Sequence, residues 1–439
     1  MRWRLALGTI RAHRASCLAS AAVMAAGTAL LAAFASLLET GLATGRDSGF
    51  LIMLPAILGG WTVAIVAFGV VSTVSLTIEH REQELALLRS IAATPRQIRQ
   101  SVVLETIVVA VPAIAAGLLP GVGLGSVVLG RLVDGGLVGA GTVLQAGRLC
   151  VAIGAGTSLC AAVAAALISS RRAASIPPVR ALTAAPPARA LTRGRVAGAG
   201  LLVIGLSLSA TTLFMDDGPL LSSTAGPAGV AVAVGLALLS PAAVLPVGWL
   251  SNARFGAVGR LAARNVHARP RHTGGVASPL ILLVGIAGGT LYMQSTEDSV
   301  SQGTTGVSAQ LAPVNYLVVA MIITFTAIVV VNTLIAATRR RRREFGLLRL
   351  SAATRGQVLG MVAAEGVVTA VLAVVLGTVA AAATTVPYSL VKTGSPLASG
   401  PIWMYGAIAG GALLLVMAAS LPTAAGALRT RPVDALSAP

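Results

Sequence analysis

The chain carries one charged stretch twice, each time between long apolar segments. The first copy reads Glu84-Leu85-Ala86-Leu87-Leu88-Arg89, and the second reads Glu344-Phe345-Gly346-Leu347-Leu348-Arg349, at an offset of 260 residues (344 minus 84). Ala-Ala-Thr follows each copy a few residues later, at the same offset. The apolar composition of a membrane protein does not by itself explain why the charged residues of the two copies occupy matching positions. We therefore interpret the two copies as paired cytoplasmic contact surfaces on a pseudo-symmetric membrane protein.

The composition is that of an integral membrane protein. Of the 439 residues, 56% are hydrophobic and only 10% are charged, whereas a soluble domain carries about 25% charged residues. About 20 apolar residues are needed to cross the hydrocarbon core. On that basis the sequence predicts ten membrane-spanning helices and an all-α fold. The spans lie near 17–38, 51–78, 101–130, 149–169, 198–214, 227–250, 276–294, 314–337, 358–385 and 403–427.

The basic residues fall almost entirely on one side of these spans. All but four of the 32 Lys and Arg residues are in loops on that side, and the exceptions are Arg46, Arg131, Arg148 and Lys392. This positive-inside asymmetry predicts a multi-pass protein of the bacterial cell membrane with both termini in the cytoplasm. We therefore attribute the net charge of +18 to the membrane topology and to attraction to anionic membrane lipid, and not to nucleic-acid binding. We interpret the arginine run 339–343 as a stop-transfer anchor in preference to an RNA or lipid-head site.

The N-terminal segment has two interpretations. Residues 1–16 form an amphipathic basic segment typical of the inner membrane surface, but the apolar run 17–38 with Ala33-Phe34-Ala35 also resembles a signal peptide with its cleavage site. Arg4-Leu5-Ala6 recurs before a later span as Arg260-Leu261-Ala262, where no signal peptide can lie. We therefore favour a retained first span.

The ends of the two halves also match. Pro178-Val179-Arg180-Ala181-Leu182 corresponds to Pro432-Val433-Asp434-Ala435-Leu436. The sequence thus predicts a first repeat over 1–182, a linker with a two-span insertion over 183–255, and a second repeat over 256–439. Because each repeat holds four spans, the repeats run parallel through the membrane. No external segment reaches the roughly 50 residues of a small domain, so we expect no large extracellular domain.

The residues after each charged stretch predict the start of a helix. Thr94-Pro95-Arg96-Gln97 has Thr at the N-cap, Pro at the first helical position and Gln three residues after the cap, the pattern of a capping box. Thr354 and Gln357 preserve it in the second copy. Each copy therefore predicts a helix, a tight turn and a capped helix that re-enters the membrane.

The sequence carries no catalytic or metal-binding constellation. It contains no P-loop, so ATP has no usual binding site on this chain. The four histidines are scattered and form no metal-ligand pair, and no serine lies near an activating His–Asp pair. We expect neither enzymatic activity nor a bound cofactor or metal.

Two acids, Glu105 and Glu365, occupy matching positions close to membrane depth. An intramembrane carboxylate is a candidate proton site. The alternative is a structural acid near the helix N-terminus and the cytoplasmic interface, paired with an arginine of the charged segment.

The leucine pairs of the two motifs also have two interpretations. Leu87 and Leu88, like Leu347 and Leu348, fall outside the predicted spans and are flanked by Glu and Arg. Apolar side chains rimmed by charge typically mark a protein contact. The alternative is packing against the chain's own cytoplasmic helices.

Together these residues resemble the FtsX-like (MacB/FtsX-type) permease family of ABC transporters. The family pattern is a long span ending in Arg and Glu, then Glu-Ile-Gly-x-Leu-Arg-Ala-x-Gly-Ala-Thr, then a span with an early Glu. The matching positions are Glu344, Gly346, Leu348, Arg349, Ala353, Thr354 and Glu365. Ala92 and Ala352 stand where the family has Gly, and Ala86 replaces the motif Gly in the first copy.

The resemblance implies a permease subunit that docks on a separate ATPase dimer, which would hold the ATP. Its expected coupling residues are Glu84, Leu87, Leu88, Arg89, Glu344, Gly346, Leu347, Leu348 and Arg349. Export or extraction of a lipophilic or peptide compound, such as an antimicrobial, is the expected activity, with an extracytoplasmic accessory protein as a further partner. A proton-driven secondary transporter using Glu105 and Glu365 is the alternative. A regulator of cell-wall hydrolases would need an external docking element that the short loops do not provide.

Overall fold

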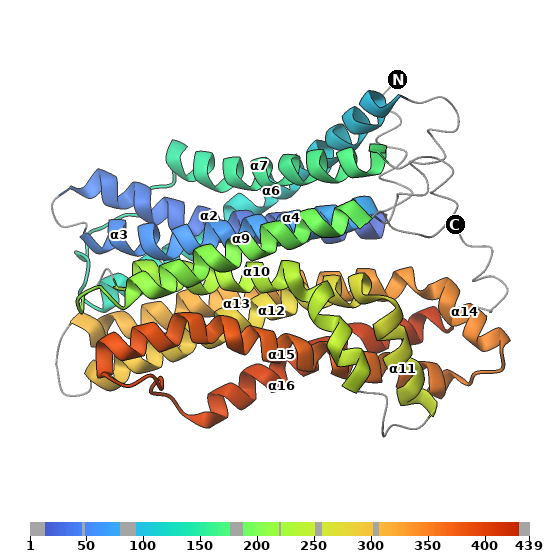
Figure 1. The fold of residues 1–439 in the computed structure, drawn as a ribbon. Coiled ribbons are helices and arrows are strands. Elements are labelled where there is room, and N and C mark those ends of the chain that lie inside the picture. The colour runs from blue at the N-terminus through green and yellow to red at the C-terminus, as the bar shows by residue number, and fades with distance from the viewer. Residues whose placement is uncertain are drawn as a thin grey trace. The chain divides into compact units, whose positions relative to one another are not determined.

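The structure, a computed structural model, describes residues 14–45, 49–79, 94–175, 188–218, 221–250, 257–301 and 307–429. Every regular element in these residues is a helix. Ten of the described helical stretches are long and apolar enough to cross a membrane. They coincide with the ten predicted spans, although most are several residues longer. The chain is therefore an all-helical, multi-pass membrane protein (Figure 1).

The helices group into two compact units, Met1–Ala188 with Ser301–Phe325, and Arg189–Val300 with Thr326–Pro439. Unit 1 holds α2 (Arg14–Thr44), α3 (Gly49–Leu54), η1 (Pro55–Gly59), α4 (Gly60–Glu79), α6 (Pro95–Asp134), α7 (Arg148–Ser175) and the first part of α13 (Val307–Arg340). Unit 2 holds most of α9 (Ala188–Thr212), α10 (Leu221–Leu250), α11 (Ala257–Ala268), α12 (Pro270–Ser301), the rest of α13, α14 (Arg342–Leu350), α15 (Arg355–Thr393) and α16 (Ile402–Ala427).

In unit 1, α2 is the central helix and packs against α4, α6 and α7. Glycines of α6 permit its close approach to α2. A Cβ on Gly121 would lie 2.6 Å from the carbonyl oxygen of Ala29, and Gly117 meets the backbone of Ala25 one turn away. Small residues at this spacing let two membrane helices approach backbone to backbone.

In unit 2, the inserted helices α9 and α10 pack together and onto α15. A Cβ on Gly235 of α10 would lie 2.9 Å from the carbonyl oxygen of Gly198 on α9. The Ser209 hydroxyl donates to the carbonyl of Ala383 on α15 at 2.9 Å. The two-span insertion thus belongs to the packing of unit 2.

The second predicted span is not one uniform helix. It consists of α3, one π-helical stretch and α4, and the irregular turn begins at Pro55. Proline has no backbone N–H and its ring clashes with the carbonyl four residues earlier, so the helix widens locally. The sequence pattern of apolar residues carried no sign of this wider turn.

Both predicted capping boxes are present at the starts of α6 and α15. The Gln97 backbone N–H donates to the Thr94 hydroxyl at 3.3 Å, and the Thr94 backbone N–H donates to the Gln97 side chain at 2.9 Å. Thr354 and Gln357 make the same pair of bonds, at 3.2 and 2.8 Å. Each box satisfies two donors at a helix end that otherwise has no intrahelical partners.

A feature the sequence did not predict is a break before the second motif. The long helix α13 ends at Arg340, Arg341 forms a turn, and α14 begins at Arg342. The Arg341 backbone N–H bonds to the carbonyl of Thr338, three residues back instead of four. This tightened turn separates the membrane-spanning helix α13 from the motif helix α14, so that α14 does not continue the axis of α13.

The turn that ends α14 is a Schellman motif with alanine in the glycine position. The Ala353 N–H bonds to the carbonyl of Leu348, and the Ala352 N–H bonds to that of Arg349. Ala352 has a φ of 66°, in the left-handed region that favours glycine. The accompanying apolar contact is also present, since Leu348 and Ala353 pack against the same buried cluster. The backbone conformation thus explains why the pattern that this motif resembles has glycine here.

Replacing Ala352 by Gly is expected to stabilise the protein. A left-handed conformation costs an L-residue roughly 1–2 kcal/mol, while glycine costs roughly 0.5–1 kcal/mol in unfolded-chain entropy. We expect a net gain of about 0.5–1 kcal/mol, seen as a higher melting temperature in mild detergent. Ala353→Gly, at a position with negative φ, is the matched control and should lower the melting temperature.

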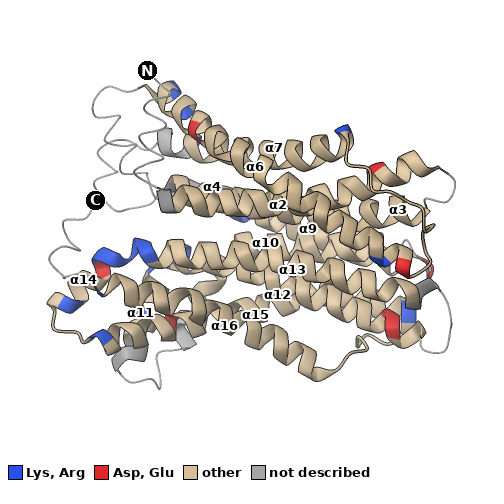
Figure 2. Ribbon diagram, turned by 180° about the vertical axis from the view of Figure 1, so that it is seen from behind, with Lys and Arg blue, Asp and Glu red and all other residues tan. Residues whose placement is uncertain are grey.

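Charge is segregated along unit 2 (Figure 2). In unit 2, the end that carries α11 and α14 is rich in arginine, and the opposite end carries acids with the single lysine, Lys392 (Figure 2). Lys392 is ion-paired there with Asp217 at 2.7 Å and with Glu297 at 3.0 Å. Tyr388 donates to the same glutamate at 2.5 Å. This cluster ties the loop after α9 to α12 and α15.

Candidate functional site

The second motif forms the short helix α14, which has two distinct faces. Arg343, Leu347 and Leu350 are exposed, the two leucines at 54% and 53% of their surface. They stand four and then three residues apart, so they share one face of the helix. Phe345 and Gly346 are buried, and Phe345 lies on the opposite side of the helix. We call Arg343, Leu347 and Leu350 the outer face of α14.

The inner face of α14 is anchored in an apolar cluster. Phe345 is 1% exposed and packs with residues of α11, α15 and the end of α16. The cluster comprises Ala262, Phe345, Val358, Met361, Val362, Ala424 and Leu428. Truncating a buried phenylalanine of this kind typically costs 3–5 kcal/mol. The cluster therefore fixes α14 firmly against the helices behind it.

An ionic network, which we call the Arg341 cluster, supports the same helix. Arg341 pairs with Glu365 on α15 and with Glu344 on α14, the latter at 3.2 Å. Arg269, between α11 and α12, binds Glu344 at 2.6 Å. Asn265 of α11 donates to Glu365 at 2.9 Å. Three helices and the turns before α12 and α14 thus meet at two carboxylates. The guanidinium centre of Arg341 also lies 5.4 Å from the Phe345 ring centroid.

The charges of this cluster stabilise one another. Partial burial acts to raise the pKa of Glu344, but hydrogen bonds and charge from Arg341 and Arg269 outweigh it, so the pKa lies below its usual value. Burial acts to lower the pKa of Arg341, and its bonds to Glu365 and Glu344 outweigh that effect, so the pKa is raised. The guanidinium therefore stays charged at every physiological pH.

This depressed pKa predicts how stability depends on pH. A carboxyl whose pKa is lower in the folded state contributes stability that is present above its unfolded pKa, about 4.3, and is lost as the pH falls through the folded value. Glu344→Gln should therefore melt below the unmodified protein by a constant margin between pH 6 and 8. The margin should shrink below about pH 4. A margin independent of pH would contradict the ion-pair role.

The structure separates the expected coupling residues by role. Of those in the second copy, only Leu347 lies on the outer face of α14. Glu344 belongs to the Arg341 cluster, Gly346 is buried and Leu348 packs inward. Arg349 donates to the carbonyl of Leu428 at the end of α16, at 3.3 Å. Leu348 thus packs against the chain's own helices, whereas Leu347 is exposed and its contact with a partner stays a prediction.

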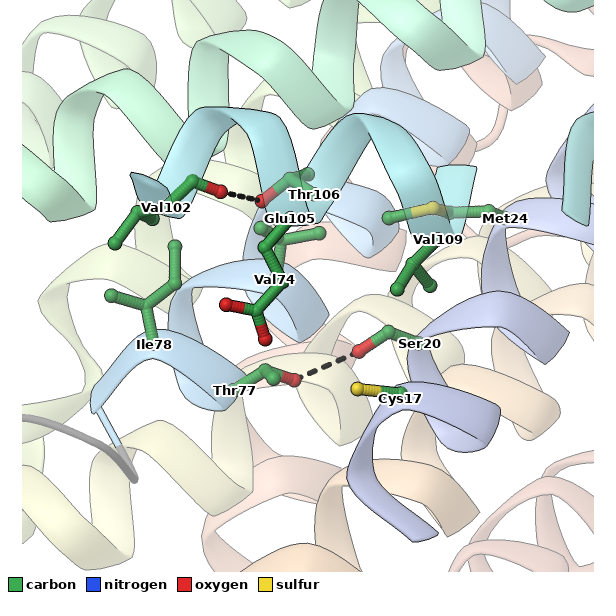
Figure 3. Close-up of a pocket in the computed structure, with 10 residues that line it drawn as sticks. All are labelled: Cys17, Ser20, Met24, Val74, Thr77, Ile78, Val102, Glu105, Thr106 and Val109. Carbon is green, nitrogen blue, oxygen red and sulfur yellow. Dashed lines mark hydrogen bonds between the residues drawn. The ribbon is translucent and has the colours of Figure 1, made fainter. Parts of the chain in front are cut away.

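The first copy of the motif cannot be compared in the same way. Glu84, Leu87, Leu88 and Arg89 lie outside the described residues. Of the two membrane-proximal acids, Glu365 meets Arg341, an arginine of the charged segment. Glu105, on α6 in unit 1, lines a pocket (Figure 3). Among the described residues, no three His, Cys, Asp or Glu side chains are grouped to hold a metal ion.

Comparison with known proteins bears directly on the motif. Residues 56–178 and 316–432, together more than half of the chain, match the family described as FtsX-like permease C-terminal. The chain belongs to the FtsX-like permease family. The two matched regions begin 260 residues apart (316 minus 56), the same offset as the two motifs. No match was found among curated proteins.

Membership in the FtsX-like permease family indicates which kind of protein carries this site. Members are membrane transport components that generally work with an ABC ATPase partner, and they are not enzymes themselves. In this FtsX-like permease, the second matched region includes α14, its turn and α15. The Arg341 cluster draws further residues, Asn265 and Arg269, from outside that region.

Several residues of the site were missed from the sequence. Leu350 and Arg343 complete the outer face, and their spacing of three and four residues from Leu347 was the available signal. Asn265 and Arg269 lie 79 and 75 residues before Glu344 (344 minus 265 and 269), and no local pattern connects them to it.

Proposed function

We propose that this FtsX-like permease is the membrane subunit of an ABC transporter and that α14 is a docking helix for a separate ATPase subunit. The observation that supports the proposal most strongly is the outer face of α14. Two leucines and an arginine are exposed at the arginine-rich end of unit 2, on a helix fixed from behind by an apolar and an ionic cluster. Exposed apolar residues rimmed by charge are typical of protein contacts.

The support behind the helix fits mechanical coupling. A rigid helix transmits a push from a partner, whereas a loose one absorbs it. The Arg341 cluster joins α14 to α15, α11 and the start of α12. Movement of the docked ATPase would therefore pass directly to the start of a membrane-spanning helix. The first motif, at the equivalent place in the first repeat, would serve the second ATPase of the dimer.

The proposed topology follows from charge and from the family. Arginine-rich ends of the units would face the cytoplasm of a bacterial cell, with both termini there. The two four-span repeats would run parallel, without a large extracellular domain, so any outer function would need an accessory protein. Export or extraction of a lipophilic or peptide compound is the proposed activity.

The test is purification of the tagged permease from its own cells in mild detergent, followed by an assay of ATP hydrolysis. The proposal expects a co-purifying subunit with a P-loop sequence, whose ATPase activity rises in the presence of the permease. If the permease is recovered intact without such a subunit, and alone drives proton-coupled transport in vesicles, the secondary-transporter alternative replaces this proposal. The pairing of Glu365 with Arg341 and Asn265 favours a structural role for that acid.

A further inference from the structure

One side of α14 carries two arginines that lack part of their hydrogen bonding. Arg342 and Arg349 are seven residues apart (349 minus 342) with Phe345 between them, so all three share the side of the helix that borders the end of α16. The Nε atoms of both arginines are buried, and neither donates to an acceptor in the part of the chain that the structure describes. Burying a polar group, above all a charged one, is costly unless it is bonded. This side of α14 is therefore suited to an anionic group.

The described carboxylates of unit 2 do not supply such a group. Glu344 and Glu365 are already engaged in the Arg341 cluster. Four other acids lie at the opposite end, which carries Lys392, in the loop after α9 and the last turns of α12: Asp216, Asp217, Glu297 and Asp298. The sequence of unit 2 contains one further acid, Asp434, which lies outside the described residues.

The two repeats carry opposite charges at the positions of Arg342 and Asp434. With the 260-residue offset of the motifs, Arg342 corresponds to Glu82. In the matching ends Pro-Val-x-Ala-Leu, Asp434 corresponds to Arg180. Glu82 and Arg180 themselves lie outside the described residues. Both signs are reversed, so each repeat still has one acid and one arginine. Positions that change together in this way are expected to be in contact, because like charges at close range repel.

The chain after α16 is long enough to bring Asp434 to Arg342. Arg349 holds the carbonyl of Leu428 at 3.3 Å, which fixes where the C-terminal segment leaves α16. Arg342 lies about 10 Å further along α14, at a rise of about 1.5 Å per residue. Asp434 follows Leu428 by six residues (434 minus 428), and a chain of that length spans up to about 20 Å. The contact therefore needs no change in α14 or α16.

We propose that the segment after α16 turns back along α14 and that the Asp434 carboxylate binds the guanidinium of Arg342. The segment then acts as a strap that holds α14 in addition to the Phe345 anchor and the Arg341 cluster, and it leaves the outer face of α14 open. The end of the first repeat could not replace this strap, because Arg180 would place a second positive charge against Arg342. This inference goes beyond the proposed function and does not depend on it, since the contact lies within the permease.

The first test measures melting temperatures of the permease alone in mild detergent. Asp434→Arg and Arg342→Glu should each lower the melting temperature by about 3 °C, the size expected when a unit of this length loses one partly buried ion pair. Arg342→Glu combined with Asp434→Arg reproduces the signs of the first repeat and should restore the melting temperature to within about 1 °C. The matched control combines Asp434→Arg with Arg343→Glu on the outer face. It has the same net charge and should remain destabilised.

The second test locates the segment directly and does not depend on stability. Arg342→Cys is combined with Asp434→Cys, and a short bismaleimide bridges the distance that the two original side chains would span. Linked peptides are identified by mass spectrometry. The control combines Arg343→Cys with Asp434→Cys, since Arg343 is the next residue but belongs to the outer face. We expect crosslinking from position 342 to be about tenfold faster than from position 343, because the strap raises the effective concentration of the second thiol there.

Two results would overturn the inference: a double charge reversal that is no more stable than its single variants, or crosslinking that is no faster from position 342 than from position 343. A lower melting temperature for Arg342→Glu with no change for Asp434→Arg would assign the anion to another source, such as a lipid phosphate, and would also overturn it. Because no ATPase is present, none of these results bears on the docking of α14.

Discussion

Leu347→Asp combined with Leu350→Asp is expected to abolish binding of the ATPase subunit while the permease still folds. Both side chains are more than half exposed, so the free permease loses little packing. In the complex, each leucine would bury apolar surface worth about 1.5–3 kcal/mol, and each aspartate would place a charge in that contact. A total loss of about 3 kcal/mol corresponds to roughly 100-fold weaker binding. Co-purification and stimulated ATP hydrolysis should both disappear.

The control for this variant lies at the same end of unit 2. Leu261 on α11 is 40% exposed but is not part of the outer face of α14. Leu261→Asp should therefore leave ATPase binding within about twofold of the unmodified protein. If Leu261→Asp weakens binding as much as the double variant, general charge at this surface is responsible and α14 is not the docking helix.

Arg341→Met is expected to give the largest loss of stability among single changes in the Arg341 cluster. The Arg341 and Glu365 side chains are 11% and 12% exposed, so removing the guanidinium leaves a nearly buried carboxylate without its ion-pair partner. Such a change typically costs 3–5 kcal/mol. We expect the melting temperature in detergent to fall by about 10 °C. ATPase stimulation should fall with it, because α14 loses its ionic support.

Two comparison variants show whether the unpaired charge is the cause. Arg341→Met with Glu365→Met replaces the pair by apolar side chains of similar length and should recover most of the lost stability. Glu344→Gln should cost far less than Arg341→Met, because Glu344 is the more exposed carboxylate, at 22%. If the double variant is no more stable than Arg341→Met, the buried-charge explanation is wrong.

The membrane-spanning helices of this chain could be predicted because hydropathy acts over about 20 residues and leaves little ambiguity. The capping boxes could be predicted as well, since Thr94 with Gln97 and Thr354 with Gln357 are local chemical patterns. The break at Arg341 was not predicted. The Arg341 side chain at this break contacts Glu365, 24 residues away, and no local sequence pattern connects the two residues.

The candidate site was predicted in outline but not in the roles of its residues. The motif pointed to α14, and Glu344, Leu348 and Arg349 were expected to contact the ATPase, with inward packing kept as an alternative only for the leucine. Their inward roles follow from how α14 lies against α11, α15 and the end of α16, and no spacing within the motif specifies that packing. At Ala352, by contrast, the sequence did point to a structural feature. This residue replaces the glycine of the family pattern, and its φ is 66°.

The most direct test of the central claim is site-specific crosslinking in cells. A benzophenone amino acid is placed at Leu347 on the outer face of α14 and, as a control, at Val371, which is 55% exposed on the membrane-spanning helix α15. The account predicts that light joins position 347, but not 371, to a subunit with a P-loop sequence. Crosslinking of position 347 only to lipid or to the permease itself, with the ATPase present and active, would contradict the account.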